Sequence, residues 1–123
     1  MAETLDLIPK VKRIVKLLDS KKALDIKAIN IAEKSALADY FIICSANNTS
    51  HVQSLSDDVE EMMSKELGIE PRRIEGYQSA NWVLLDFNDV IVHIFYKESR
   101  QYYALDKLWA DGIPLDISDV VVP

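Results

Sequence analysis

Two segments of the chain repeat apolar residues every three or four positions, which is the spacing of an amphipathic helix. The first runs from Leu7 to Leu18, with lysine and arginine between the apolar residues. Pro9 is expected in its first turn, where proline is tolerated. The second runs from Val52 to Met63. Both segments are predicted to be helices that bury one face.

The second helix also carries residues that favour a defined start and end. Ser50 and Gln53 have the spacing of a capping box, in which each side chain satisfies a free backbone donor at the start of a helix. Gly68 follows the apolar stripe and predicts the end of the helix. A third amphipathic segment, from Tyr102 to Trp109, is expected to form a last helix.

The other apolar segments have the composition of β-strands. LDIKAINIA alternates and then changes phase, which predicts a strand that ends or bulges near Ala28. DYFIICSA is apolar on both faces, as a central strand would be, and RRIEG is short enough for an edge strand. WVLLDF and VIVHIFY are joined at Asn88 and Asp89, residue types that suit a tight hairpin turn.

Helices and strands in this order predict an α/β fold of the α+β kind, a single-domain mixed β-sheet flanked by helices. The long connection through the second helix should join parallel strands. The chain of 123 residues is long enough for one hydrophobic core but not for two. We expect one domain over residues 1–111 and an extended C-terminal tail over residues 112–123.

Charge and cysteine content narrow the classes of function. The formal net charge of −6 opposes nonspecific binding to nucleic-acid phosphates and suits a basic protein partner better. Cys44 is the only cysteine, so an internal disulfide and a cysteine-based zinc site are excluded. No secretory signal and no apolar run of about 20 residues is visible. A cytoplasmic protein without a membrane span is expected.

Two histidines raise the question of catalysis. Cys44 with His51 would form a nucleophile and base, but Cys44 lies in an apolar strand, so a structural role is favoured. His93, with Asp86 and Asp89 on the partner strand and turn, has the residue types for general acid and base work. An isolated strand histidine is more often structural. No cofactor, metal or phosphate motif accompanies these residues.

Trp82 stands at the start of a strand, directly after the polar loop YQSAN. At a strand end, tryptophan is typical of an anchor for a protein partner, because it buries a large area at little cost in rotamer entropy. A core position is an equally good interpretation of the composition alone.

Three ordered blocks, ADYFIICSANNTSHVQ, EGYQSANWVLLDFNDVIVHIF and ESRQYYALDKLWAD, resemble the ribosomal silencing factor family, also called RsfS or Iojap. The resemblance implies a cytosolic, non-enzymatic factor with a nucleotidyltransferase-like fold. It further implies binding to the large ribosomal subunit through ribosomal protein L-fourteen, which keeps the small subunit from joining and represses translation. The paired carboxylates of nucleotidyltransferases are missing here, so catalysis does not follow from the fold. Ala80 and Asn88 stand where the family often has glycine.

From the resemblance and the residues together, we expect a docking surface with Trp82 as its apolar anchor. Its predicted residues are Glu75, Gly76, Tyr77, Asn81, Trp82 and Asp86. Glu75 and Asp86 would meet lysine or arginine on a basic ribosomal protein, and little direct nucleic-acid contact is expected. A diverged nucleotidyltransferase-like enzyme using His93, Asp86 and Asp89 is the alternative. The apolar sheet also makes a homodimer plausible.

Overall fold

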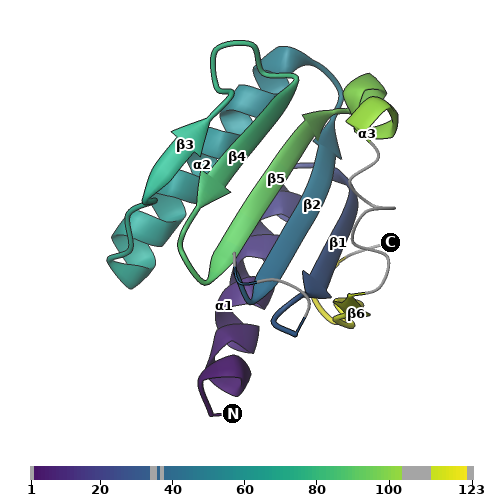
Figure 1. Cartoon of the computed structure of the whole chain (residues 1–123). Coiled ribbons are helices and arrows are strands. Elements are labelled where there is room, and N and C mark those ends of the chain that lie inside the picture. The colour runs from purple at the N-terminus through teal and green to yellow at the C-terminus, as the bar shows by residue number, and fades with distance from the viewer. Residues whose placement is uncertain (1, 34–35, 37, 104–111, 122–123) are drawn as a thin grey trace.

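The structure, a computed structural model, describes residues 2–33, 36, 38–103 and 112–121. These residues form helices that are separated along the chain by two or more strands (Figure 1). In chain order the elements are α1 (Ala2–Ser20), β1 (Leu24–Asn30), β2 (Tyr40–Ala46), α2 (Thr49–Leu67), β3 (Arg73–Glu75), β4 (Trp82–Asp86), β5 (Val90–Tyr96), α3 (Lys97–Tyr103) and β6 (Ile113–Pro114).

The strands form one mixed sheet in the order β3-β4-β5-β2-β1-β6. β2 and β5 pair in parallel, and the other neighbours pair antiparallel. β2 and β3, which α2 connects, therefore run in the same direction, as the sequence predicted. The mixed sheet flanked by helices confirms the predicted fold class.

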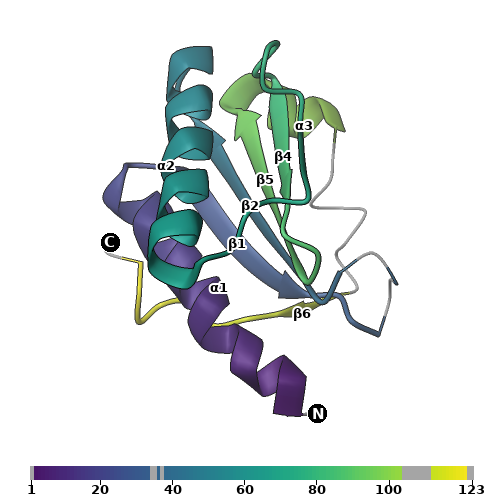
Figure 2. The same cartoon turned by 90° about the vertical axis from the view of Figure 1, so that its left-hand side faces the viewer.

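Both long helices lie on one face of the sheet, and α3 lies on the other (Figure 2). The larger core cluster fills the layer between the sheet and α1 and α2, with Val11, Ile14 and Leu18 fully buried in it. A smaller cluster, which includes Phe41 and Phe95, lies on the opposite face. Successive residues of the central strands point to opposite faces, so β2 is buried at every position.

Helix α2 matches the predicted apolar stripe but not the predicted cap. Its buried residues are Val52, Leu55, Ser56, Val59, Met62 and Met63. The N-cap is Asn48, whose Oδ1 accepts a hydrogen bond from His51 N at 2.8 Å. The capping box of Ser50 and Gln53 is therefore wrong, because the helix is capped two residues earlier, by Asn48. Gly68 ends the helix at φ 65°, as predicted.

Helix α1 begins earlier than the sequence suggested. It starts at Ala2, so Pro9 lies inside the helix and not in its first turn. Pro9 is exposed, and water can therefore satisfy the backbone carbonyl that lacks its usual N–H partner. The buried residues of α1 from Leu7 to Leu18 keep the predicted helical spacing.

The irregularity in β1 lies at the start of the strand and not near Ala28. The register shifts between Leu24 and Lys27, where Asp25 has φ 53°. Ala28 faces the larger cluster, whereas Ile29 faces the smaller one. The apparent change of phase near Ala28 therefore reflects a strand with both faces covered, because neighbouring residues of such a strand are both apolar.

The hairpin of β4 and β5 and the edge position of β3 are as predicted. Asn88 in the hairpin turn has φ 79°, and Ala80 in the loop before β4 has φ 56°. Both are positions where glycine is the easier residue. Asparagine adopts this conformation readily, whereas alanine does so at some cost.

The described part of the predicted C-terminal tail packs against the same core as the helices. β6 pairs with β1, and Leu115 N donates to Ala28 O at 2.8 Å. Ile117, Val120 and Val121 then pack against the larger cluster. Of the predicted last helix, α3 covers the start, and residues 104–111 lie outside the described residues.

Candidate functional site

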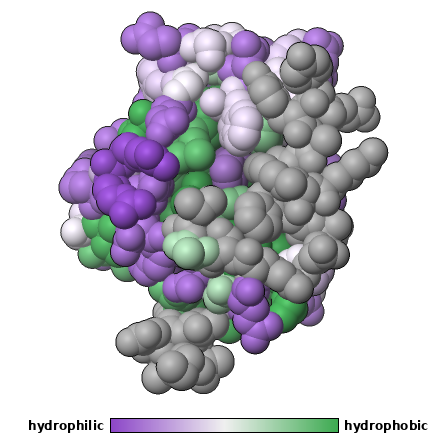
Figure 3. All heavy atoms as spheres, viewed as in Figure 1, coloured by the Kyte–Doolittle hydropathy of each residue, from purple (hydrophilic) through white to green (hydrophobic). Residues whose placement is uncertain are grey.

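Of the predicted docking residues, Glu75, Trp82 and Asp86 lie on β3 and β4 and face away from α1 and α2 (Figure 1). Gly76, Tyr77 and Asn81 lie in the loop between these two strands. Viewed from the side opposite α1 and α2, hydrophilic side chains gather beside a band of hydrophobic ones (Figure 3). The register sets Glu75 of β3 opposite Leu84, and Leu84 opposite His93 of β5. In the next row Trp82 lies opposite Phe95. These strands therefore present acidic, aliphatic and aromatic side chains side by side.

Trp82 is half-buried, so neither of its two predicted roles holds alone. Its ring stacks on Phe95 with a centroid distance of 5.0 Å and an interplanar angle of 24°. Its Nε1 donates to Nδ1 of His93 at 3.0 Å. Phe95 is fully buried beneath it. Trp82 thus packs on the buried ring of Phe95 while part of its side chain stays accessible, as an anchor requires.

The loop before Trp82 is held close to the strand by its backbone. Gly76 has φ 81°, and a Cβ atom there would overlap the carbonyl oxygen of Trp82. Ala80 N donates to Gly76 O at 2.9 Å, and Tyr96 N donates to Asn81 O at 3.0 Å. Only glycine fits the close approach at position 76. The loop therefore fixes where β4, and with it Trp82, begins.

Tyr77 lies on the α2 side of this loop. Its hydroxyl donates to Oδ2 of Asp57 at 3.1 Å, and its carbonyl accepts from Nε2 of Gln53 at 3.0 Å. The hydrogen bond to the Asp57 carboxylate raises the pKa of Tyr77. The structure therefore brings Glu75 and Trp82 together on one face, with Gly76 and exposed Asn81 at its rim, and turns Tyr77 toward the helix.

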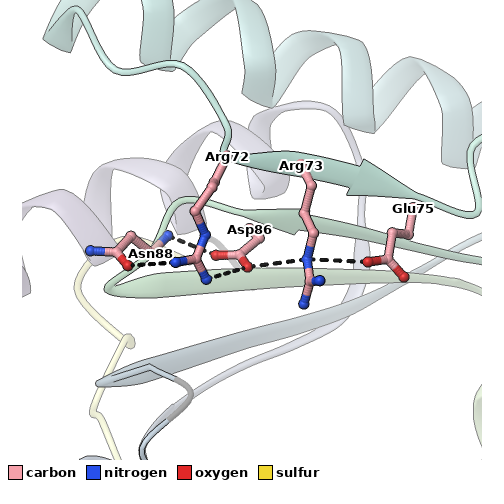
Figure 4. Close-up of polar contacts among 5 residues, drawn as sticks. All are labelled: Arg72, Arg73, Glu75, Asp86 and Asn88. Carbon is pink, nitrogen blue, oxygen red and sulfur yellow. Dashed lines mark hydrogen bonds and ion pairs between the residues drawn. The ribbon is translucent and has the colours of Figure 1, made fainter.

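Asp86 is placed differently from the expectation that its carboxylate meets a partner. Its side chain is only 1% exposed, and Oδ2 lies 2.9 Å from Nη2 of Arg72 and 3.3 Å from Nε of Arg73 (Figure 4). Its Oδ1 accepts from Asn88 N at 2.8 Å. Burial raises the pKa of Asp86, but the hydrogen bonds from Arg72 and Asn88 outweigh it and hold the pKa below its usual range. A direct contact with a partner does not fit this burial.

Two arginines that the sequence reasoning left out belong to this surface. Arg72 and Arg73 are 60% and 57% exposed, and both are anchored on Asp86. Nε of Arg73 also lies 3.1 Å from Oε2 of Glu75 (Figure 4). The sequence does hint at these ion pairs, because RRIEG has two consecutive arginines and the next strand contains an aspartate. Their pairing depends on the register of β3 with β4.

The residues of the enzyme alternative do not form one site. His93 bonds to Trp82, Asp86 bonds to the two arginines, and Asp89 pairs with Nζ of Lys10 at 2.9 Å. No hydrogen bond or ion pair joins His93 to either carboxylate, and all three residues are within the described part of the chain. Burial lowers the pKa of His93 to about 3, so its ring holds no exchangeable extra proton near neutral pH.

Cys44 has the structural role that was favoured for it. It is fully buried, and burial raises the pKa of its thiol to about 12, which keeps it protonated and unreactive. His51 lies elsewhere, with Nδ1 accepting from Asn47 N and Nε2 2.9 Å from Lys21 O. Among the described residues, no cluster of three or more histidine, cysteine or acidic side chains could hold a metal ion. No helix in that part of the chain is long and apolar enough to cross a membrane.

A family model described as ribosomal silencing factor during starvation matches residues 4–122 of the chain. The match extends through the segment that was predicted to be a tail. It covers β3, the loop and β4, and thus every residue of the surface described above.

Individual proteins of known name are also similar. A ribosomal silencing factor from Halalkalibacterium halodurans is 41% identical over 87% of this chain and 91% of its own length. A mouse protein named mitochondrial assembly of ribosomal large subunit protein 1 is 30% identical over 80% of this chain and 44% of its own length. A crystal structure from Bacillus halodurans superposes with a TM-score of 0.75 at 38% identity, covering 88% of this chain and 97% of that one.

Proposed function

The chain belongs to the ribosomal silencing factor family, and from this membership we propose that it binds the large ribosomal subunit through ribosomal protein L-fourteen. Binding there occupies the surface of the large subunit that faces the small subunit, which keeps the small subunit from joining and represses translation. The inhibition is steric and requires no chemical reaction. A mouse relative is named for the ribosomal large subunit, which supports this choice of partner. We expect the protein to act in the cytoplasm.

One observation carries the proposed binding surface. Trp82 is half-buried and stacks on the buried ring of Phe95, on the sheet face opposite α1 and α2. Glu75 lies on the same face and is 56% exposed, so it can meet a cation of a basic protein. Gly76 and Asn81 form the rim. Asp86 contributes by holding Arg72 and Arg73 in place and makes no contact of its own.

Replacement of Trp82 by alanine is expected to weaken binding to isolated large subunits by about 30-fold, because a central aromatic anchor is typically worth about 2 kcal/mol. Trp82→Phe should lose less affinity than Trp82→Ala, since it keeps much of the apolar area. Leu67→Ala is the matched control, because Leu67 is 43% exposed at the end of α2, away from this face. Co-sedimentation measures all three. A folded Trp82→Ala variant that binds like the wild type would remove Trp82 from the interface.

Added salt is expected to weaken binding, because exposed charges within about 10 Å are screened at 0.1 M ionic strength. Glu75→Gln should lower the affinity a few-fold at low salt and flatten the salt dependence. Glu61→Gln is the control, since Glu61 is equally an exposed glutamate paired with a neighbouring cation, but on α2. Affinities for large subunits at several salt concentrations test this. An unchanged salt dependence in Glu75→Gln would exclude Glu75 from the contact.

Two finer expectations remain predictions. Little direct contact with nucleic acid is expected, and self-association as a homodimer is to be checked by light scattering at micromolar concentration. The enzyme alternative has no support from the arrangement of His93, Asp86 and Asp89 described above.

A further inference from the structure

His93 lies directly beneath the anchor of the proposed docking surface. It is 3% exposed, and its ring centroid is 5.8 Å from that of Trp82 and 4.5 Å from that of Phe41. Its neighbours on the same face of β5 are Ile91 and Phe95, both buried and apolar. His93 is thus a polar side chain in the middle of an otherwise apolar cluster.

The hydrogen bond from Trp82 fixes the state of the imidazole ring. The indole N–H can only donate, so Nδ1 of His93 must accept and the proton of the neutral ring must lie on Nε2. Nε2 is buried and has no hydrogen-bond partner among the described residues. Because burial lowers the pKa of His93 to about 3, the ring keeps this neutral form under ordinary conditions. A buried donor without a partner costs stability, and an apolar residue here would avoid that cost.

What this arrangement supplies is the orientation of the indole. Stacking on Phe95 contacts the face of the Trp82 ring and does not distinguish one edge of the indole from the other. The bond of Nε1 to His93 directs the N–H edge of the indole toward the buried imidazole. An anchor held in its binding orientation before the partner arrives loses less entropy on binding.

We propose that His93 is a positioning residue of the docking surface, whose Nδ1 holds the indole of Trp82 in the orientation that the ribosomal partner receives. This inference rests on the proposed function and adds a residue to it that makes no contact with the partner. The hydrogen bond from the indole N–H requires an acceptor atom at the position of Nδ1. A large apolar residue at position 93 would fill the space without orienting the indole.

The hydrogen bond can be tested in the free protein. His93→Leu removes the acceptor, and the nuclear magnetic resonance signal of the Trp82 indole N–H is expected to move and to exchange faster with solvent. His93→Asn places an amide oxygen near the former Nδ1 and should retain the bonded signal. Both variants are compared by circular dichroism to show that they fold. An unmoved indole signal in His93→Leu would overturn the proposal, because no orienting bond would then exist.

A double-mutant cycle tests whether the bond matters for docking. His93→Leu is expected to weaken binding to isolated large subunits about fivefold, the size of one hydrogen bond, and His93→Asn to restore it. In a Trp82→Phe background, which has no indole N–H, His93→Leu should have no further effect. Equal losses in both backgrounds would mean a purely structural role, and no loss in either would mean no role. If the wild type fails to bind large subunits, the proposed function itself fails.

Discussion

Acidification from pH 7 to pH 4.5 is expected to lower the free energy of unfolding by about 2.5 kcal/mol through His93 alone. Burial holds its pKa near 3 in the folded protein, whereas in the unfolded chain it returns to about 6.5. Below pH 6.5, His93 therefore binds a proton in the unfolded chain but not in the folded protein. Stability is complete above pH 6.5 and falls as the pH drops toward 3.

Urea denaturation followed by circular dichroism at a series of pH values measures this loss. His93→Leu should flatten the curve between pH 7 and pH 4.5, a window above the ordinary pKa values of carboxyl groups. His51→Gln is the control, because it removes the other histidine and leaves the His93 contribution intact. The same slope in His93→Leu as in the wild type would show that His93 is not buried as a neutral ring.

Gly76→Ala is expected to destabilise the fold by about 3 kcal/mol or more. The new Cβ would overlap the carbonyl oxygen of Trp82, which belongs to the backbone of β4 and cannot move without shifting the strand. The positive φ of 81° adds strain. Because the displaced residue is the anchor itself, binding to large subunits should be lost along with stability.

Gly68→Ala provides the comparison within the same chain. Gly68 has a similar positive φ of 65°, but a Cβ there would meet nothing within 4 Å. Its replacement should cost only the conformational strain of about 1 kcal/mol. Urea midpoints of the two variants separate the effect of the overlap from the effect of the backbone conformation. Equal losses would show that the loop before Trp82 can relax away from the strand.

Local patterns in the sequence were enough to predict most elements of the fold. The stripe from Val52 to Met63 follows from helical spacing, and the turn at Asn88 follows from a residue type that tolerates positive φ. The α2 cap was harder, because Asn48 and Ser50 are both good capping residues and only the path of the loop decides between them.

The candidate site was less predictable, because its contacts depend on register between strands. Arg73 of β3 and Arg72 just before it pair with buried Asp86, and nothing within WVLLDF indicates that pairing. The bond from Trp82 to His93 also depends on register, and it is diagonal, because the residue directly opposite Trp82 is Phe95. Composition suggested an anchor or a core residue, and the packing makes Trp82 partly both.

The way the sheet ends on either side bears on the solubility of the protein. At one end β3 has only three residues, two of them charged. At the other, β6 and Leu115 occupy the outer hydrogen-bonding positions of β1 from Ala28 to Asn30, and the irregularity at Asp25 interrupts the rest. Among the described strands, neither end offers a long regular edge on which a strand of another molecule could add. The C-terminal segment thus covers part of the edge of β1, where such an addition could otherwise occur.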